Sequence, residues 1–172
     1  MSKRLLSKYD GKKQGWLRLL IEIVILVVVV FILFKLVIGL SVVDGISMYP
    51  TLKSGDVVLY TRIVTDCEPG DVVSVKMPSG ELYVKRVVAT AGDVVDIHNG
   101  VLYVNGQSID EDQTFGKTQP EDGTVTYPYT VEDGKVFVLG DNREASVDSR
   151  SFGAVLIKQV KGKIRFYFGK MD

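Results

Sequence analysis

The sequence predicts a mainly β fold, in which one membrane-spanning helix at the N-terminus precedes a single β-rich domain. Residues 19–40 form one long apolar segment that only Glu22 and Lys35 interrupt. After this segment the chain consists of short runs of β-forming residues separated by Gly, Asp and Pro. With 172 residues, the chain is long enough for one domain with a core and an anchor.

The apolar segment is long enough to cross a membrane. At a rise of about 1.5 Å per residue, residues 19–40 span about 33 Å, against a hydrocarbon core of ~30 Å. No small-x-small cleavage site follows promptly, so we expect an anchor that is retained and not a cleaved secretory signal. Residues 1–18 carry six basic side chains and one acidic side chain. The positive-inside rule therefore predicts a cytoplasmic tail over 1–18 and an extracytoplasmic domain over 41–172.

The charge distribution also limits the partners of the chain. The formal net charge is zero, so the +5 of residues 1–18 leaves −5 on the rest of the chain. The basic tail can contact anionic lipid headgroups of a bilayer. The folded part is mildly acidic and has no basic stripe, which argues against nucleic-acid binding.

Alternating and β-branched patterns predict the strands, and turn residues predict their connections. Asn99-Gly100, directly after His98, and Asn105-Gly106 are typical of tight hairpin turns that need positive φ angles. Residues 107–133 are acidic and poor in core-forming side chains, as in a loop-rich insertion. The predicted strands are residues 56–62, 71–76, 82–89, 94–98, 101–104, 136–139 and 163–168.

The residues available for catalysis favour a serine with a lysine as its base. The chain has one histidine, His98, and one cysteine, Cys67, which leaves little material for Ser-His-Asp or Cys-His chemistry. Ser47 lies in a turn-like stretch beside Gly45, and Lys85 lies in a β-rich run. No metal-ligand cluster, phosphate-binding glycine loop or Cys-x-x-Cys pair is present, so we expect no metal and no cofactor.

Lys85 can act as a base only if its pKa is lowered from about 10.4 by burial. In a strand over 82–89, Tyr83 and Val87 share its face, while Arg86 points the other way. Taken singly, the pattern around Lys85 favours a solvated strand lysine, and a turn serine fits Ser47 as well as a nucleophile does. Residues 140–153 are polar and lie between two apolar runs, as in a solvated loop or in a buried network. In such a network Ser146 would bond the lysine and Asp148 would pair with an arginine.

Four motifs together resemble the bacterial type I signal peptidases, in their short form with a single anchor that is seen in Gram-positive bacteria. The resemblance extends from the basic tail to Phe168. The motifs, in the order of that family, are Ser47-Met48-x-Pro50-Thr51, Gly55-Asp56-Val57-Val58, Tyr83-Val84-Lys85-Arg86 and Gly140-Asp141-Asn142-Arg143 with Ser146-x-Asp148-Ser149-Arg150.

The resemblance implies roles for these residues. Ser47 would be the nucleophile and Lys85 the general base that later protonates the leaving amine. Ser146 would orient Lys85, and Asp148 would pair with Arg86 and Arg150 in a supporting ion pair. The oxyanion hole would include the backbone N–H of Ser47, whereas the hydroxyl that some members carry two residues earlier is replaced by Gly45.

The resemblance also implies a fold, a substrate and a location. The fold would be a signal-peptidase-like β-rich core with a small β-hairpin insertion over roughly 92–135. Secretory preproteins would be cleaved after small-x-small sites by an enzyme held in the cell membrane by a single pass. An extended substrate would add beside a strand edge, with shallow apolar pockets for its small side chains. The expected pocket residues are Val43, Met48, Leu52, Tyr83 and Val84.

Three other functions remain open at this point. The first is a specialised signal peptidase that serves a few substrates, such as surface-fibre subunits. The second is a non-catalytic anchored β-domain that binds or assembles secreted proteins. The third is a self-cleaving Ser-Lys protease of the repressor type, against which the membrane helix and the lack of a DNA-binding domain argue.

Overall fold

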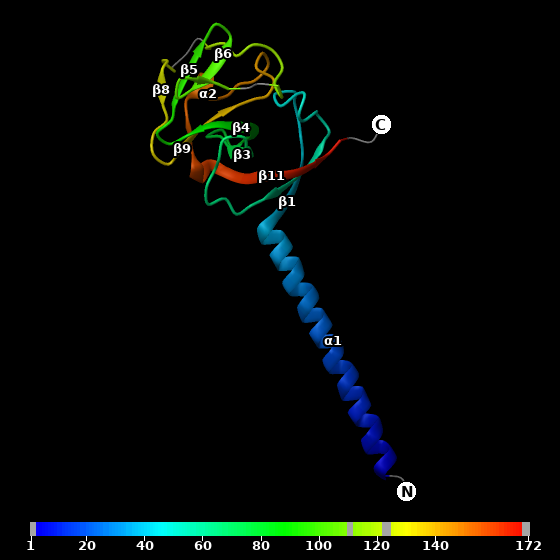
Figure 1. Ribbon diagram of the computed structural model, residues 1–172. Helices are drawn as coiled ribbons and strands as arrows, with labels where there is room; N and C mark the ends of the chain where they lie inside the picture. Colours follow the sequence, from blue (N-terminus) through cyan, green and yellow to red (C-terminus); the bar gives the residue numbers. More distant parts are fainter. Residues whose placement is uncertain (1–2, 110–111, 122–124, 170–172) are drawn as a thin grey trace. The chain divides into compact units, whose positions relative to one another are not determined.

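The computed structural model of the chain describes residues 3–109, 112–121 and 125–169 (Figure 1). The chain divides into two units, a helical one up to Ile38 and a β-rich one from Gly39 onward. The helical unit consists of helix α1, Lys3–Val37, in which Gly15–Val37 has a mean hydropathy of 3.1 and is long and apolar enough to cross a membrane. The helix ends at Val37, three residues before the expected end at Leu40, because strand β1 (Ile38–Val42) begins at the next residue.

Most strands of the β-rich unit belong to one sheet, which confirms the mainly β prediction. Among the described residues this sheet has seven strands in the order β1-β2-β11-β3-β4-β9-β10. The long strand β11 pairs with β2 along one part of its length and with β3 along another. The pairs β2–β11, β11–β3, β3–β4, β4–β9 and β9–β10 are all antiparallel. The strands are β1 (Ile38–Val42), β2 (Val57–Thr61), β3 (Val72–Lys76), β4 (Leu82–Thr90), β9 (Lys135–Leu139), β10 (Val155–Leu156) and β11 (Val160–Phe168).

A second, four-stranded sheet is formed within the described part of residues 94–130, in the order β7-β6-β5-β8. Asn99 and Gly100 both have positive φ, as do Asn105 and Gly106, so both expected turns are confirmed. The strands are β5 (Val94–His98), β6 (Val101–Val104), β7 (Gln107–Ser108) and β8 (Tyr129–Thr130). Two short helical segments follow β9, namely α2 (Ser149–Phe152) and the 3-10 turn η1 (Ile157–Gln159).

The two sheets share a core, and a smaller cluster lies under the candidate site. Side chains of β4 and β9 pack against side chains of β5 and β6 in one buried cluster that includes Phe137, Leu139 and Leu102. This cluster holds the segment after β9 in a fixed position relative to both sheets. The smaller cluster joins the residues around Ser47 to β2 and consists of Val43, Met48, Leu52 and Val58.

Candidate active site

Ser47 lies in a turn that local sequence and burial both define. Gly45 precedes it with a φ of 95°, a conformation that residues with a Cβ rarely adopt. The N–H of Tyr49 donates to the carbonyl of Ile46 at 3.1 Å and closes the turn. The next side chain, Met48, is buried in the small cluster, so the Ser47 hydroxyl lies above the core at its edge.

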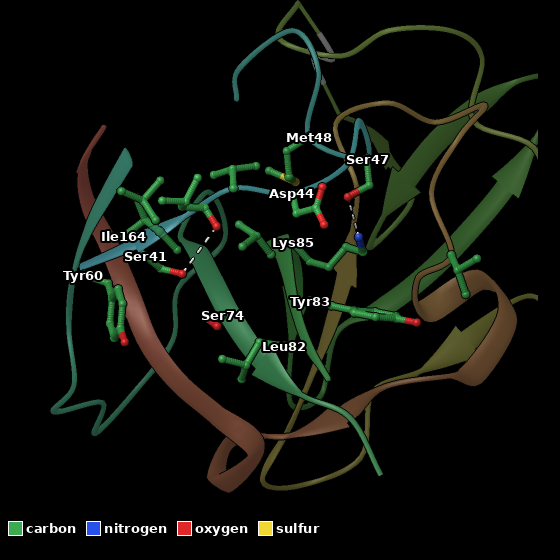
Figure 2. A pocket seen from close by; sticks show the side chains of 15 residues that line it. Ser41, Asp44, Ser47, Met48, Tyr60, Ser74, Leu82, Tyr83, Lys85 and Ile164 are labelled. Atoms are coloured by element: carbon green, nitrogen blue, oxygen red, sulfur yellow. Dashed lines mark hydrogen bonds between the residues drawn. The ribbon is translucent and has the colours of Figure 1, made fainter. Parts of the chain in front are cut away.

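Lys85 reaches this hydroxyl from β4 (Figure 2). It lies opposite Val73 in the register of β4 with β3, in the interior of the seven-stranded sheet. Its side chain is 3% exposed, and its Nζ lies 2.9 Å from the Ser47 Oγ, a hydrogen-bonding distance. The same Nζ lies 5.3 Å from the centre of the Tyr83 ring, on the expected shared face of the strand.

Burial lowers the pKa of Lys85 from 10.5 to about 8. The loss of water around the ammonium is the largest cause, because it disfavours the charged form. Of the nearby charges, Asp148 and Asp141 raise the pKa and Arg150 lowers it, and together they do not cancel the effect of burial. A neutral amine can accept the hydroxyl proton of Ser47, and a protonated amine donates to its oxygen.

Two buried carboxylates near Lys85 are each engaged by an arginine. Asp141 accepts two hydrogen bonds from Arg86, from Nε at 2.8 Å and from Nη2 at 2.6 Å. Asp148 accepts two from Arg150, from Nε at 2.9 Å and from Nη2 at 3.0 Å. Such two-point pairing satisfies both charges in a site shielded from water.

The expectation that Asp148 pairs with both arginines is therefore wrong for Arg86. Arg86, on β4, lies opposite Leu139, on β9. Its side chain therefore meets Asp141, which comes two residues after Leu139. Asp148 instead caps helix α2 by accepting from the backbone N–H of Arg150, and it also accepts from the N–H of Gly140. Asp148 thus fixes the loop over 140–150 from within.

Ser146 is close to the nucleophile, but it does not bond to the lysine. Its Oγ is buried and has no hydrogen-bond partner among the described residues, so the expected bond to Lys85 is not formed. A Cβ at Gly140 would clash with the Ser146 hydroxyl and with the carbonyl oxygen of Ser47. Only glycine therefore allows the loop after β9 to approach the nucleophile turn this closely.

A pocket of about 430 Å³ opens beside Ser47 and Lys85. Of the five expected pocket residues, Val43, Met48, Tyr83 and Val84 line it. Leu52 does not; it is 1% exposed and fills the cluster beneath, so its assignment to substrate binding is corrected to a core role. Sequence reasoning missed the other lining residues, which are Ser41, Val42, Asp44, Val58, Tyr60, Ser74, Leu82, Val147 and Ile164.

One wall of this pocket is the open edge of a strand. The pairing of β4 with β3 extends from Leu82 to Arg86, whereas its described pairing with β9 begins only at Arg86. The backbone of residues 82–85 therefore has no strand partner on its second side within the described chain. An extended peptide can pair with such an edge and place its side chains in the pocket.

Among the described residues, those outside the pocket give no sign of a second catalytic centre. His98 is half-exposed at the end of β5, where it stacks on Tyr103 and lies 3.4 Å from the carboxylate of Asp96. Cys67 is a buried free thiol in a core cluster. Within the described residues, no group of three or more His, Cys, Asp or Glu side chains is placed to hold a metal ion.

Comparison with known proteins adds a family to this geometry. The chain matches the family model described as "Signal peptidase, peptidase S26" over residues 16–169. The chain belongs to the signal peptidase family. It is 39% identical over 140 residues to a signal peptidase I of Bacillus caldolyticus, covering 74% of this chain and 77% of that protein.

Other members of the signal peptidase family agree with this assignment. The chain is 36% identical to the signal peptidase IB of Staphylococcus aureus over 173 residues, which covers 91% of both proteins. The crystal structure of a signal peptidase I from Enterococcus faecalis is 31% identical, with a TM-score of 0.50, and it matches 60% of this chain and 100% of that chain. The apolar helix is consistent with a membrane-anchored member of the family.

Two features of this signal peptidase family member were not assigned by sequence reasoning. Asp141 belongs to one of the four motifs but has no role predicted from sequence, although its place two residues after a buried strand marks it as a candidate for pairing with an adjacent strand. The open edge of β4 follows from unequal strand lengths, because β4 has nine residues and β9 has five. In the sequence, only the difference in length between the two strands indicates this open edge.

Proposed function

We propose that this chain is a membrane-anchored serine endopeptidase that removes N-terminal signal peptides from exported preproteins. Ser47 is the nucleophile and Lys85 is the general base in this proposal. The observation that carries it is the 2.9 Å distance between Ser47 Oγ and Lys85 Nζ, together with the lowered pKa of Lys85. With a pKa of about 8, about a tenth of the lysine is neutral at pH 7, compared with well under a thousandth for an unshifted lysine.

In the first half of the reaction, Ser47 Oγ attacks the carbonyl carbon of the scissile peptide bond, and its proton passes to Lys85 Nζ. The carbonyl oxygen becomes an oxyanion. The backbone N–H of Ser47 makes no hydrogen bond to another described residue and can donate to this oxygen. The tetrahedral intermediate then collapses, the carbon–nitrogen bond breaks, and the ammonium of Lys85 gives its proton to the leaving amine.

In the second half, water hydrolyses the ester that joins the signal peptide to Ser47. The neutral amine of Lys85 takes a proton from the attacking water and returns it to Ser47 Oγ when the ester bond breaks. The products are the carboxylate end of the signal peptide and the restored serine. Gly45 supplies no hydroxyl to the oxyanion, so a second donor has to come from a backbone N–H or from water.

The open edge of β4 supports binding of an extended substrate beside residues 82–85. Backbone hydrogen bonds to this edge would hold the segment before the cleavage site, and alternate side chains would point into the pocket. Val43 and Met48, which are almost fully buried, form part of the pocket floor and leave little depth for large side chains. This arrangement favours small residues at the first and third positions before the cut.

The anchor fits a site at the membrane surface. Gly15–Val37 has 23 residues, which as a helix extends about 35 Å. Ser47 comes ten residue positions after Val37, so even a fully extended chain would place it at most roughly 35 Å from the end of the helix. Under the positive-inside rule, the basic residues at the N-terminus face the cytoplasm and the domain over 41–172 faces outward, with the insertion over roughly 92–135 as a part of it.

The test is cleavage of a model preprotein by the full-length chain in detergent. Wild type should cut after a small-x-small site, and Ser47→Ala and Lys85→Ala should abolish cleavage while the far-UV spectrum stays unchanged. Lys85→Arg should also fail, because a guanidinium stays protonated and cannot act as a base. EDTA should have no effect. Appreciable cleavage by Lys85→Ala would defeat the assignment of the base.

The alternative is a non-catalytic anchored domain that binds secreted proteins through the same open edge. That function requires the pocket but not the chemistry of Ser47 and Lys85. Wild type would then bind a signal-peptide segment without cutting it, and Ser47→Ala would bind equally well. A specialised signal peptidase would cut a few preproteins only, which a panel of preproteins in the same assay would reveal.

A further inference from the structure

Residues 112–121 lie across the loop that follows β9, and we call this segment the strap. The backbone of Phe115 forms a parallel bridge with Asn142. Its N–H donates to the carbonyl of Asp141 at 2.8 Å, and its carbonyl accepts from the N–H of Arg143 at 2.9 Å. The strap is thus hydrogen-bonded through its backbone to Asp141 and Arg143, the two residues on either side of Asn142.

Side chains fix the strap at two further points after this bridge. Arg143 Nη1 donates to the Oγ1 of Thr118 at 2.6 Å, and Thr118 is fully buried. Further along the strap, Glu121 lies 3.3 Å from the Nη2 of Arg150, the arginine that also pairs with Asp148. The strap is therefore tied to the same buried ion pair that fixes the loop beside Lys85.

The residues held by the strap contact the nucleophile turn directly. The backbone N–H of Asn142 donates to the carbonyl of Ser47 at 3.0 Å, and its Nδ2 donates to the carbonyl of Ile46 at 3.2 Å. On the other side of the turn, the Phe115 ring packs edge-on against Tyr49 at 5.6 Å between centroids. Phe115 therefore touches the turn through its ring and through the bridged Asn142.

We propose that Phe115 is a positioning residue for Ser47, and that it acts through Tyr49 and Asn142 to hold the Ser47 hydroxyl within reach of Lys85. This proposal rests on the proposed peptidase function and adds a role for the strap to it. A displacement of about 1 Å at a reacting atom can cost on the order of a hundredfold in rate. Phe115 and Tyr49 are 48% and 40% exposed, so their contact adds little to folding stability.

The test combines steady-state kinetics with a double-mutant cycle on the full-length chain, using Phe115→Ala, Tyr49→Ala and the double variant. Each single variant should lower kcat about tenfold while KM changes less than twofold. The double variant should be no slower than the slower single variant, because both remove the same contact. Tyr49→Phe should retain activity, because it keeps the ring that meets Phe115. The pH midpoint of activity should stay unchanged, since Lys85 keeps its surroundings.

Tyr103→Ala is the matched control, because it breaks another aromatic pair at the surface, the stack of Tyr103 on His98. It should leave kcat unchanged and shift the unfolding temperature about as much as Phe115→Ala does. A second readout, amide hydrogen exchange at Asn142, does not depend on activity, and the exchange should be faster in Phe115→Ala than in wild type.

The outcomes separate the two proposals. If wild type cleaves and Phe115→Ala matches it in kcat and in Asn142 exchange, the positioning role is wrong and the peptidase function stands. A rise in KM alone would show that Phe115 contacts substrate, which also overturns the proposal. If wild type does not cleave, the peptidase function fails, and the exchange rate at Asn142 still decides whether the strap holds the turn.

Discussion

Replacing Lys85 by methionine is expected to abolish cleavage and to stabilise the β-rich unit near neutral pH. Methionine is similar in length to lysine and fills the same apolar surroundings without a charge. The carboxylates of Asp141 and Asp148 keep their own arginine partners, so the substitution leaves no buried charge unpaired. The change therefore removes the cost of a buried ammonium and adds no new electrostatic cost.

The expected gain follows from the pKa of Lys85. Its fall from 10.5 to about 8 corresponds to about 3 kcal/mol, at about 1.4 kcal/mol per unit. The lost hydrogen bond to Ser47 offsets about 1 kcal/mol, because that hydroxyl is partly exposed and can bond to water instead. The net gain in the free energy of unfolding is about 2 kcal/mol at pH 7.

The sign of the pH dependence is opposite to that of a salt-bridged lysine, whose raised pKa makes stability fall as pH rises. Below pH 8 the lysine is protonated in both states, and the folded wild type bears the full cost of the buried charge. Between pH 8 and 10.5 the folded state binds fewer protons than the unfolded state, so wild-type stability rises with pH. The advantage of methionine should therefore shrink across this window.

Urea unfolding of the full-length chain in mild detergent measures this difference, with tyrosine near-UV circular dichroism as the signal. We expect Lys85→Met to be more stable at pH 7 and to lose most of that advantage by pH 10. An equal gain at both pH values, or a loss at pH 7, would refute the argument from desolvation. Lys163→Met is the matched control. Burial alone would lower the pKa of Lys163, but its hydrogen bonds to Asp71 and Asp66 outweigh this and raise the pKa, so its removal should destabilise the chain.

Three further predictions concern the same site. The kcat/KM for a signal-peptide substrate should rise about tenfold per pH unit below a midpoint near 8, because neutral Lys85 is the active form; a flat profile would contradict this. Asp148→Ala should lower the free energy of unfolding by about 3 kcal/mol, because buried Arg150 loses its two-point partner and keeps only the longer ion pair with Glu121 at 3.3 Å; a loss under 1 kcal/mol in a denaturant titration would contradict this. Gly140→Ala should lower kcat at least about tenfold in the preprotein assay, because its methyl group would displace Ser47; wild-type rates would disprove that clash.

The fold could be predicted because its strands and turns are indicated by local sequence patterns. Strands β5 and β6 begin and end at the residues expected from alternation, since the Asn99-Gly100 turn sets their register. The nucleophile and the base could also be singled out, because a chain with one histidine offers few ways to activate a serine. Their proximity was an expectation from family resemblance, since no local pattern relates a turn at residue 47 to a strand at residue 85.

The errors concern contacts that depend on the register between distant segments. Arg86 and Asp148 carry opposite charges, but the pairing of β4 with β9 brings Asp141 to the arginine first. Leu52 follows the nucleophile in sequence, but its N–H bonds to the carbonyl of Met48, and this turn directs the side chain inward. The strap has few apolar residues, and its position depends on backbone bridges that a sequence pattern does not encode.

The two arginines explain why a lysine beside two carboxylates can still serve as a base. A carboxylate without a partner at this depth would become the counter-ion of Lys85 and hold its proton. Arg86 and Arg150 each occupy one carboxylate with two hydrogen bonds, and Arg150 also lowers the pKa of the lysine directly. Burial then remains the dominant influence on the amine. The ion pairs thus contribute to the chemistry of the site, because they keep the two carboxylates from pairing with Lys85. They also fix the 140–150 loop.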